Sequence, residues 1–387
     1  MNRVDVRVRG HLSTLTEAEL GPLIHRQPME SEGVGEAVAA LVADVRLRGD
    51  EALREMASRF DGVELDSLEV SPEAWDEALD ALDSSVRRGL ERAAENIRTF
   101  HAAQVPQDVV VEVEPGVRIT RTWAPLQRVG VYAPGGTAAY PSSVLMGVVP
   151  AKAAGVDDVV VCSPPGPDGR PPAAVLAACA IAGADRLYAL GGAGAVAALA
   201  YGTESVPTVD AIVGPGNRWV TEAKRQVAGT VLIDSPAGPS EVLVLLDETG
   251  DPRFAAHEML AQAEHDPDAS CVLVSTSRRV ADETERTLVD LLEDAPRGHI
   301  ARRALADEGG ILIAESMEQA LDFTDRYAPE HLSIMTADAA AHARSLRNSG
   351  TTFVGPWASV AHGDYMTGAN HVLPTAGRAR SFSGLSI

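Results

Sequence analysis

Three neighbouring stretches decide the fold: VGVYAP (residues 129–134), SSVLMGVVPAKAAG (142–155) and DDVVVC (157–162). The first and third are short apolar runs, which are typical of β-strands buried on both faces. The second is longer and has the length of a helix. A strand, a helix and a second strand in this order predict a parallel sheet with helices packed against it.

The same alternation extends further along the chain. It continues through AAVLAACAIAG (173–183), RLYALGG (186–192) and VDAIVGPG (209–216), and a second series runs from EVLVLLD (241–247) to TFVG (352–355). We therefore expect an α/β protein with two Rossmann-like parallel-sheet domains.

Two regions break this alternation. Residues 33–104 repeat apolar residues at intervals of three and four, which predicts a helical N-terminal segment, with Ser71 before Pro72 as an N-cap. Residues 109–123, VVVEVEPGVRITRTW, alternate apolar and polar residues around Pro115–Gly116 and predict a hairpin.

These patterns suggest a division into domains. We expect an N-terminal arm over residues 1–25 and an inserted Rossmann-like domain over 132–238. A discontinuous Rossmann-like domain over 26–131 and 239–380 would carry the metal-binding and catalytic residues. Residues 381–387 would be the short stub of a C-terminal tail.

Composition limits the classes of function. The 387 residues are 45% hydrophobic and 23% charged, as in compact globular proteins of two or three domains. The net charge of −22, without a block of Lys or Arg, argues against nucleic-acid binding. No run of 18 apolar residues and no signal-peptide pattern is present, so we expect a cytoplasmic protein without a membrane anchor. Three widely spaced cysteines indicate buried small side chains rather than disulfides.

A glycine-rich turn follows the predicted strand RLYAL (186–190). The residues Gly192 to Ala197 satisfy G-x-G-x-x-[GA] at the start of a helix. No acidic residue stands clearly at the distance expected for a ribose contact, since Asp210 comes too early. The motif therefore leaves two interpretations open, dinucleotide binding and tight packing of a helix on a strand.

A polar stripe follows the predicted helix RFAAHEMLAQAEHD (253–266). Glu258, Gln262 and His265 recur at i, i+4 and i+7. Gln262 and His265 lie one turn apart and can reach one metal ion together, and imidazole suits zinc. By spacing alone the stripe indicates either a metal site or a solvated helix end.

Two further clusters carry groups suited to catalysis or binding. Glu330 and His331 stand directly before a predicted strand, where a histidine beside a carboxylate can act as a base near neutral pH, or can form a surface ion pair. The stretch GDYMTGANHVLPTAG (363–377) places Asp364 and His371 among turn residues. It predicts a loop that folds over a site, or an irregular terminus.

Taken together, these stretches resemble the histidinol dehydrogenase family, in family order and over roughly residues 30–387. The matching motifs are GVYAPGG, YPSSVLM, GPGNRWVTEAKRQV, AGPSEVLVLLD, LAQAEHDPDA, YAPEHLSI and FVGPWASVAHGDYMTGANHVLPT. The resemblance implies a homodimeric, zinc-dependent and NAD-linked enzyme that oxidises L-histidinol through histidinal to L-histidine, the last steps of histidine biosynthesis.

The resemblance also implies roles for individual residues. His331 would be the base that removes the alcohol proton, and Glu330 would activate water for the second oxidation. The residues implied as zinc ligands are Gln262, His265 and Asp364. Those implied to contact the small-molecule substrate are Ser240, Gln262, His265, His331, Asp364 and His371. Those implied to contact NAD are Tyr132, Gly194 and Asn217.

The chain departs from the family at two places. Gly194 stands where the family usually has a glutamine that contacts NAD, so a backbone contact replaces the side chain or NAD binds more weakly. The family also continues several dozen residues beyond FSGLSI, into a helical tail that supplies a zinc-binding histidine and a substrate-binding glutamate across a dimer interface. With three protein ligands, zinc would be completed by water, substrate or such a tail and would bind more weakly than in a closed site.

Three hypotheses follow from the sequence. The first is histidinol dehydrogenase. The second is a related zinc- and NAD-dependent dehydrogenase that acts on another small polar alcohol. The third is a non-catalytic relative, against which the intact Glu330–His331 pair argues.

Overall fold

The computed structural model describes residues 3–26, 33–135, 139–235 and 238–387, which form two compact units. Unit 1 consists of the described residues of Met1–Glu30, Ala237–Gly363 and Leu373–Gly384. Unit 2 consists of those of Ser31–Pro236, Asp364–Val372 and Leu385–Ile387.

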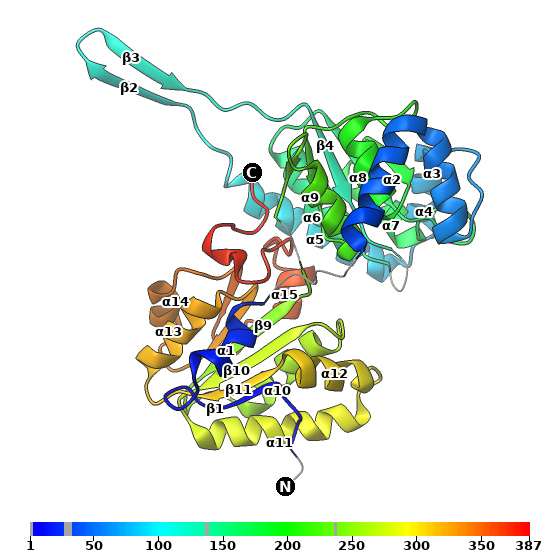
Figure 1. Ribbon diagram of the computed structural model, residues 1–387. Helices are drawn as coiled ribbons and strands as arrows, with labels where there is room; N and C mark the ends of the chain where they lie inside the picture. Colours follow the sequence, from blue (N-terminus) through cyan, green and yellow to red (C-terminus); the bar gives the residue numbers. More distant parts are fainter. Residues whose placement is uncertain (1–2, 27–32, 136–138, 236–237) are drawn as a thin grey trace. The chain divides into compact units, whose positions relative to one another are not determined.

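Unit 1 is built on a parallel sheet with the strand order β1-β11-β10-β9-β12-β13 (Figure 1). Its strands are β1 (Val8–His11), β9 (Glu241–Leu246), β10 (Ser270–Ser275), β11 (Gly310–Ile313), β12 (His331–Met335) and β13 (Thr351–Val354). Its helices are α1 (Glu17–Ile24), α10 (Pro252–Ala263), α11 (Arg278–Asp294), α12 (Gly298–Glu308), α13 (Met317–Tyr327), α14 (Ala339–Ser345) and the 3-10 helix η2 (Arg378–Arg380). Helix α15 (Val360–Tyr365) runs from unit 1 into unit 2.

Both faces of this sheet are covered, which explains why its strands are apolar throughout. Val242 and Val244 of β9 pack with buried residues of α10, α11 and α12. Leu243 and Leu245 point to the other face and pack with α1 and α13. The sheet is therefore the middle layer of three.

Unit 2 has a second parallel sheet, ordered β6-β5-β4-β7-β8. Its strands are β4 (Arg128–Tyr132), β5 (Asp158–Ser163), β6 (Arg186–Ala189), β7 (Ala211–Val213) and β8 (Leu232–Ile233). Its helices are α2 (Val34–Arg48), α3 (Asp50–Met56), the π-helix η1 (Ala57–Asp61), α4 (Pro72–Ala81), α5 (Ser84–Ala102), α6 (Pro141–Ala153), α7 (Ala173–Ala182), α8 (Gly192–Tyr201) and α9 (Arg218–Val227).

The strands from β4 to β8 and from β9 to β13 follow the same order, with the first strand of each series in the middle. This is the strand order of a Rossmann-type half, and the order reverses at the β4/β7 and β9/β12 pairs. The prediction of two Rossmann-like parallel-sheet domains is confirmed. The helices expected over residues 33–104 are present, and Ser71 is the N-cap of α4, although its side chain does not bond to the helix backbone.

The observed units group the chain differently from the expected domains. Residues 33–131, expected to join the catalytic domain, belong to unit 2. Val38, Val42 and Val45 of α2 are buried in one core with β4–β7 and α8. The expected N-terminal arm is instead part of unit 1, because β1 pairs with β11 and α1 packs on the sheet.

The predicted hairpin is present as β2 (Val109–Glu114) and β3 (Val117–Arg121), an antiparallel pair drawn as a long ribbon in Figure 1. Gly116 turns it with φ of +82°, a conformation that glycine adopts readily. Every residue of both strands is exposed, although many are apolar. Among the described residues, every helix is too short or too polar to cross a lipid bilayer.

Candidate functional site

The predicted catalytic pair lies at the amino-terminal edge of the unit 1 sheet. His331 is the first residue of β12 and Glu330 precedes it, and both side chains are buried. A surface ion pair, the alternative interpretation of this motif, is therefore wrong. Ligands of doubly wound sheets usually bind at the carboxyl ends of the strands, so this pair occupies the opposite edge.

The surroundings of His331 determine its tautomer. Its Nδ1 lies 2.9 Å from the carbonyl oxygen of Glu241 and 3.5 Å from the carboxylate of Glu330. A carbonyl oxygen can only accept, so Nδ1 carries the proton of the neutral imidazole. Nε2 is then the nitrogen that can take up a proton, as a general base requires.

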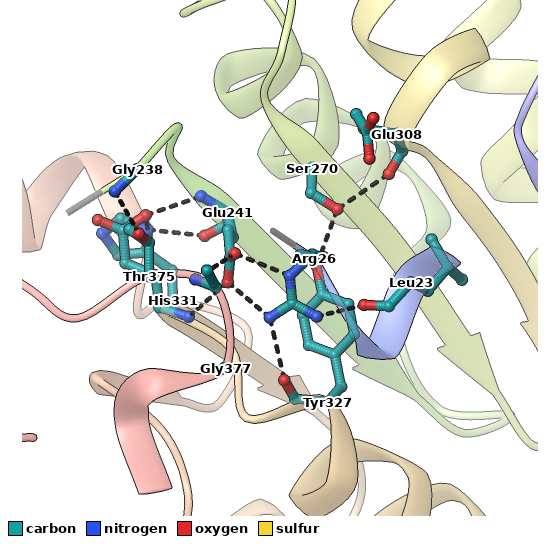
Figure 2. A network of polar contacts seen from close by, with 12 residues as sticks. Leu23, Arg26, Gly238, Glu241, Ser270, Glu308, Tyr327, His331, Thr375 and Gly377 are labelled. Atoms are coloured by element: carbon teal, nitrogen blue, oxygen red, sulfur yellow. Dashed lines mark hydrogen bonds and ion pairs between the residues drawn. The ribbon is translucent and has the colours of Figure 1, made fainter. Parts of the chain in front are cut away.

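Glu241, the first residue of β9, connects several parts of this edge (Figure 2). Its backbone N–H donates to the Glu330 carboxylate at 2.7 Å, and its own carboxylate accepts two hydrogen bonds from Arg26, at 2.8 and 2.9 Å. The backbone N–H of Ala376 donates to the same carboxylate at 2.7 Å. The carboxylate of Glu241 thus connects segments from near both ends of the described chain.

The candidate substrate and zinc residues of unit 1 lie at the same sheet edge. Ser240 immediately precedes β9, and its carbonyl accepts from the backbone N–H of Ser270 at the start of β10. Gln262 is a buried residue in the last turn of α10, just ahead of β10. His265 lies two residues beyond the end of the helix, and its backbone N–H donates to the carbonyl of Gln262 at 3.2 Å.

The residues of the polar stripe predicted along α10 have different surroundings. The carboxylate of Glu258 is buried and accepts the backbone N–H of Val360 at 3.2 Å, which holds the start of α15. Desolvation lowers the pKa of the His265 imidazole, opposed by Asp266 and reinforced by Arg297. A lowered pKa favours the neutral imidazole, which is the form that binds zinc.

The remaining predicted ligands belong to unit 2. Asp364 lies in α15 and is half-buried, and His371 lies in the segment that follows. Its neighbour Asn370 is buried and donates to the carbonyl of Met146 at 2.8 Å, which anchors this segment to α6. Within the described parts of the chain, no group of three or more His, Cys, Asp or Glu side chains is arranged to hold a metal ion.

The predicted NAD residues gather at the carboxyl edge of the unit 2 sheet, beside the β4/β7 switch point. Tyr132 ends β4, and its hydroxyl accepts the backbone N–H of Gly192 at 3.2 Å. Burial raises the pKa of Tyr132 to about 12, so the phenol stays neutral. Asn217 follows β7 and is the N-cap of α9, where its side chain accepts from Trp219 and Val220.

Gly194 lies in the first turn of α8 and is buried. A Cβ atom built on it would lie 2.9 Å from the Sδ of Met56 and 3.3 Å from a methyl carbon of Leu53. Both neighbours come from α3, so α3 packs directly on the glycine. In this chain Met56 fills the space that a glutamine side chain at this position would need.

Sequence reasoning missed two residues of the catalytic edge. Arg26 lies in a part of the chain that was assigned to no site, and nothing in its local sequence distinguishes it from a surface arginine. Glu241 had a signal, because it is the one charged residue within the otherwise apolar run EVLVLL (241–246). A charge that opens a buried strand must be paired or hydrogen-bonded.

Comparison with known proteins identifies the family. The family model described as histidinol dehydrogenase matches residues 24–387. Histidinol dehydrogenase of Methanosarcina mazei is 49% identical over 377 residues, which are 97% of this chain and 87% of that protein. The enzyme of Natronomonas pharaonis is 51% identical over 361 residues, 92% of this chain and 84% of that protein.

A solved structure extends the agreement to the fold. The crystal structure of histidinol dehydrogenase from Elizabethkingia anophelis superposes with a TM-score of 0.93 at 34% identity, and the match covers 100% of this chain and 88% of that one. The chain therefore belongs to the histidinol dehydrogenase family, which catalyses the NAD-linked oxidation of histidinol to histidine.

Proposed function

We propose that this chain carries out the zinc-dependent oxidation of L-histidinol, through histidinal, to L-histidine, with the residues assigned above. The observation that supports these roles best is the buried Glu330–His331 pair, in which a backbone carbonyl holds the Nδ1 of the imidazole. A base held in one tautomer and one orientation is suited to repeated proton transfer from an alcohol.

The two residues have different tasks in this proposal. His331 accepts the hydroxyl proton of the alcohol at Nε2, because loss of a hydride is easier from an alkoxide. Glu330 takes a proton from the water that hydrates the aldehyde, and its carboxylate is held by the Glu241 N–H at 2.7 Å. Histidine and carboxylate are the usual groups for these transfers.

Zinc would be held by Gln262, His265 and Asp364, and Ser240 and His371 would contact the substrate. The residues of unit 1 fit this role: Gln262 supplies an amide oxygen in the last turn of α10, and the lowered pKa of His265 favours the neutral imidazole. When bound, zinc would fix the substrate in place, and NAD would accept the hydride.

NAD would bind at the carboxyl edge of the unit 2 sheet, where Tyr132, Gly194 and Asn217 lie. Helix α8 has Gly191 as its N-cap, which has no capping side chain, and in its first turn the Tyr132 hydroxyl accepts the backbone N–H of Gly192. Uncapped backbone N–H groups at a helix N-terminus are suited to phosphate oxygens. NAD would then contact the backbone at Gly194 and not a side chain at this position.

The assignment of the two catalytic residues can be tested by separating the half-reactions. With NAD and Zn²⁺ present, His331→Asn should lower turnover of L-histidinol by about 100-fold or more. Glu330→Gln should mainly slow the oxidation of histidinal. His299→Asn, on the exposed face of α12, is the matched control and should leave both rates unchanged. Equal and mild effects of the first two variants on both steps would contradict the assignment.

Zinc dependence needs a separate measurement. Metal analysis before and after addition of Zn²⁺ should show uptake by the parent chain and weaker uptake by His265→Asn. Activity on L-histidinol should rise with the bound zinc. A parent chain that is fully active without zinc would contradict the metal assignment.

We also infer that the chain pairs with a second copy of itself through the β2–β3 hairpin. An isolated two-stranded hairpin is at best marginally stable in water. Val111 and Ile119, which face each other across it, are 48% and 57% exposed. The two strands are complementary in charge, because β2 carries Glu112 and Glu114 and β3 carries Arg118 and Arg121.

The oligomeric state tests this inference. The parent chain should elute with the mass of a dimer in size-exclusion chromatography with light scattering. The double variant Val111→Glu with Ile119→Lys should be monomeric at the same concentration. Leu47→Lys, which changes an 84% exposed leucine of α2, should remain dimeric. A dimer that survives the hairpin variant would show that the hairpin is not the interface.

A further inference from the structure

A buried ion pair lies behind the catalytic residues of unit 1. The side chains of Arg26 and Glu241 are 6% and 4% exposed, and their two hydrogen bonds measure 2.8 and 2.9 Å. Arg26 also donates to the backbone carbonyl of Tyr327 at 3.0 Å and to that of Leu23. Its guanidinium lies 3.6 Å from the centre of the Tyr327 ring. These contacts fix the position of the Arg26 guanidinium (Figure 2).

The ion pair fixes the side chain of Glu241, and the backbone of Glu241 contacts both proposed catalytic side chains. The backbone of Glu241 holds both members of the catalytic pair: its N–H bonds to the Glu330 carboxylate and its carbonyl to Nδ1 of His331. The Glu241 carboxylate also accepts the backbone N–H of Glu330, at 3.4 Å. The position of one residue therefore determines the orientation of both.

We propose that Arg26 and Glu241 are positioning residues for the Glu330–His331 pair. By fixing the side chain of Glu241, Arg26 fixes the peptide groups that hold the His331 imidazole as the Nδ1–H tautomer and orient the Glu330 carboxylate. This inference rests on the proposed roles of Glu330 and His331 and adds the residues that keep them in place.

The backbone on the far side of Glu241 supports a role beyond folding. Ala376 has φ of +54°, in the left-handed region that costs an alanine about 1 kcal/mol. In this conformation its N–H points at the Glu241 carboxylate, at 2.7 Å. The neighbouring Thr375 is held through its hydroxyl, which accepts the backbone N–H of Gly238 at 2.5 Å. Strained backbone that persists around one carboxylate is typical of a functional site.

Stability alone is a weak explanation for this pair. Burying two charges costs several kcal/mol of desolvation, and apolar replacements of such pairs are often as stable. Desolvation lowers the pKa of Arg26, but Glu241 and Tyr327 outweigh it and the net shift is upward, so the guanidinium keeps its charge. The two hydrogen bonds from the planar Arg26 guanidinium fix the orientation of the Glu241 carboxylate, which apolar contacts would not do.

The test compares Arg26→Lys with a matched control. Lysine keeps the positive charge but cannot make the two parallel hydrogen bonds to Glu241. We therefore expect kcat for L-histidinol to fall by about 10–100-fold, while KM changes less than about threefold. The control is Glu285→Gln, which disrupts another two-bond arginine pair in unit 1, the partly buried pair with Arg9. It should lose a similar amount of thermal stability and keep the parent kcat.

A second readout does not depend on activity. Nitrogen-15 NMR of the His331 ring, assigned by its loss in His331→Asn, should show Nδ1–H in the parent and in Glu285→Gln. In Arg26→Lys it should show a mixture of tautomers. If Arg26→Lys does not fold, the double variant Arg26→Met with Glu241→Gln, which removes both charges, should fold and show the same mixture.

The outcomes separate this inference from the proposed function. A parent that does not oxidise L-histidinol but shows the tautomer change would overturn the function and support the positioning role. An active parent whose Arg26 variants keep both the tautomer and kcat would overturn the positioning role. Equal losses of kcat in Arg26→Lys and Glu285→Gln would also overturn it.

Discussion

Gly194→Gln, which introduces the residue that the family resemblance implies at this position, should destabilise unit 2. The new Cβ would lie 2.9 Å from the Met56 Sδ and 3.3 Å from a Leu53 methyl, where carbon atoms normally keep about 3.5–4 Å. Overpacking of this kind costs about 1–3 kcal/mol. Replacing a helical glycine returns up to about 1 kcal/mol. The net loss should be about 1–2 kcal/mol, or about 2–8 °C in the melting temperature of a domain of this size.

Met56→Ala should relieve this conflict, because the clashing atom is the far end of a flexible side chain. Alone, Met56→Ala should cost about 1–2 kcal/mol, since Met56 is only half-buried. Combined with Gly194→Gln it should cost less than the sum of the two by about 1–2 kcal/mol. If the glutamine then reaches NAD, the double variant should bind NAD more tightly than the parent.

Four chains are enough for the measurement: the parent, the two single variants and the double variant. Thermal unfolding gives the coupling free energy, and calorimetric titration with NAD gives the affinity. Additive losses of stability, or a Gly194→Gln chain as stable as the parent, would show that the Gly194–Met56 contact does not exclude larger side chains.

Two further predictions concern buried charges of unit 2. Burial disfavours the Asp50 carboxylate, but hydrogen bonds from Ser205 and Thr203 outweigh it and lower the pKa below 3.8. The ionised carboxylate therefore stabilises the folded state above the unfolded pKa of Asp50, and this stabilisation is lost as the pH falls through its folded pKa. In urea titrations, Asp50→Asn should be less stable than the parent at pH 6, and the difference should disappear below about pH 3.8. Lys224→Met should cost about 3–5 kcal/mol in the same assay, because it leaves the Asp234 carboxylate buried without its cation; a loss below about 1 kcal/mol would contradict this.

The parts of the fold that sequence could predict depend on local patterns. Buried parallel strands are short and apolar, so EVLVLL and its counterparts were recognisable without tertiary information. Glu330 and His331 could be proposed because they are adjacent, and Gln262 and His265 because they lie one helical turn apart; both pairs lie at the same sheet edge. The fold class and the family followed from these motifs.

Contacts between residues that are far apart in the sequence could not be predicted from such local patterns. Val38, Val42 and Val45 show that α2 has a buried face, but an amphipathic pattern does not say which sheet covers it. Arg26 and Glu241 are 215 residues apart in sequence, and a single ion pair leaves no periodic signal. The grouping of residues 33–131 and the contacts behind the catalytic pair therefore required the structure.

The contacts of Glu241 also set the order of events during protein synthesis. Arg26 leaves the ribosome early, whereas Ala376, which donates to the same carboxylate, follows about 350 residues later. At about 5–20 residues per second this delay is about 20–70 s. Throughout that time the nascent chain has the arginine but lacks the complete set of bonds around Glu241. A ribosome-bound chain should therefore lack the complete set of bonds that holds the Glu330–His331 pair until Ala376 has been synthesised.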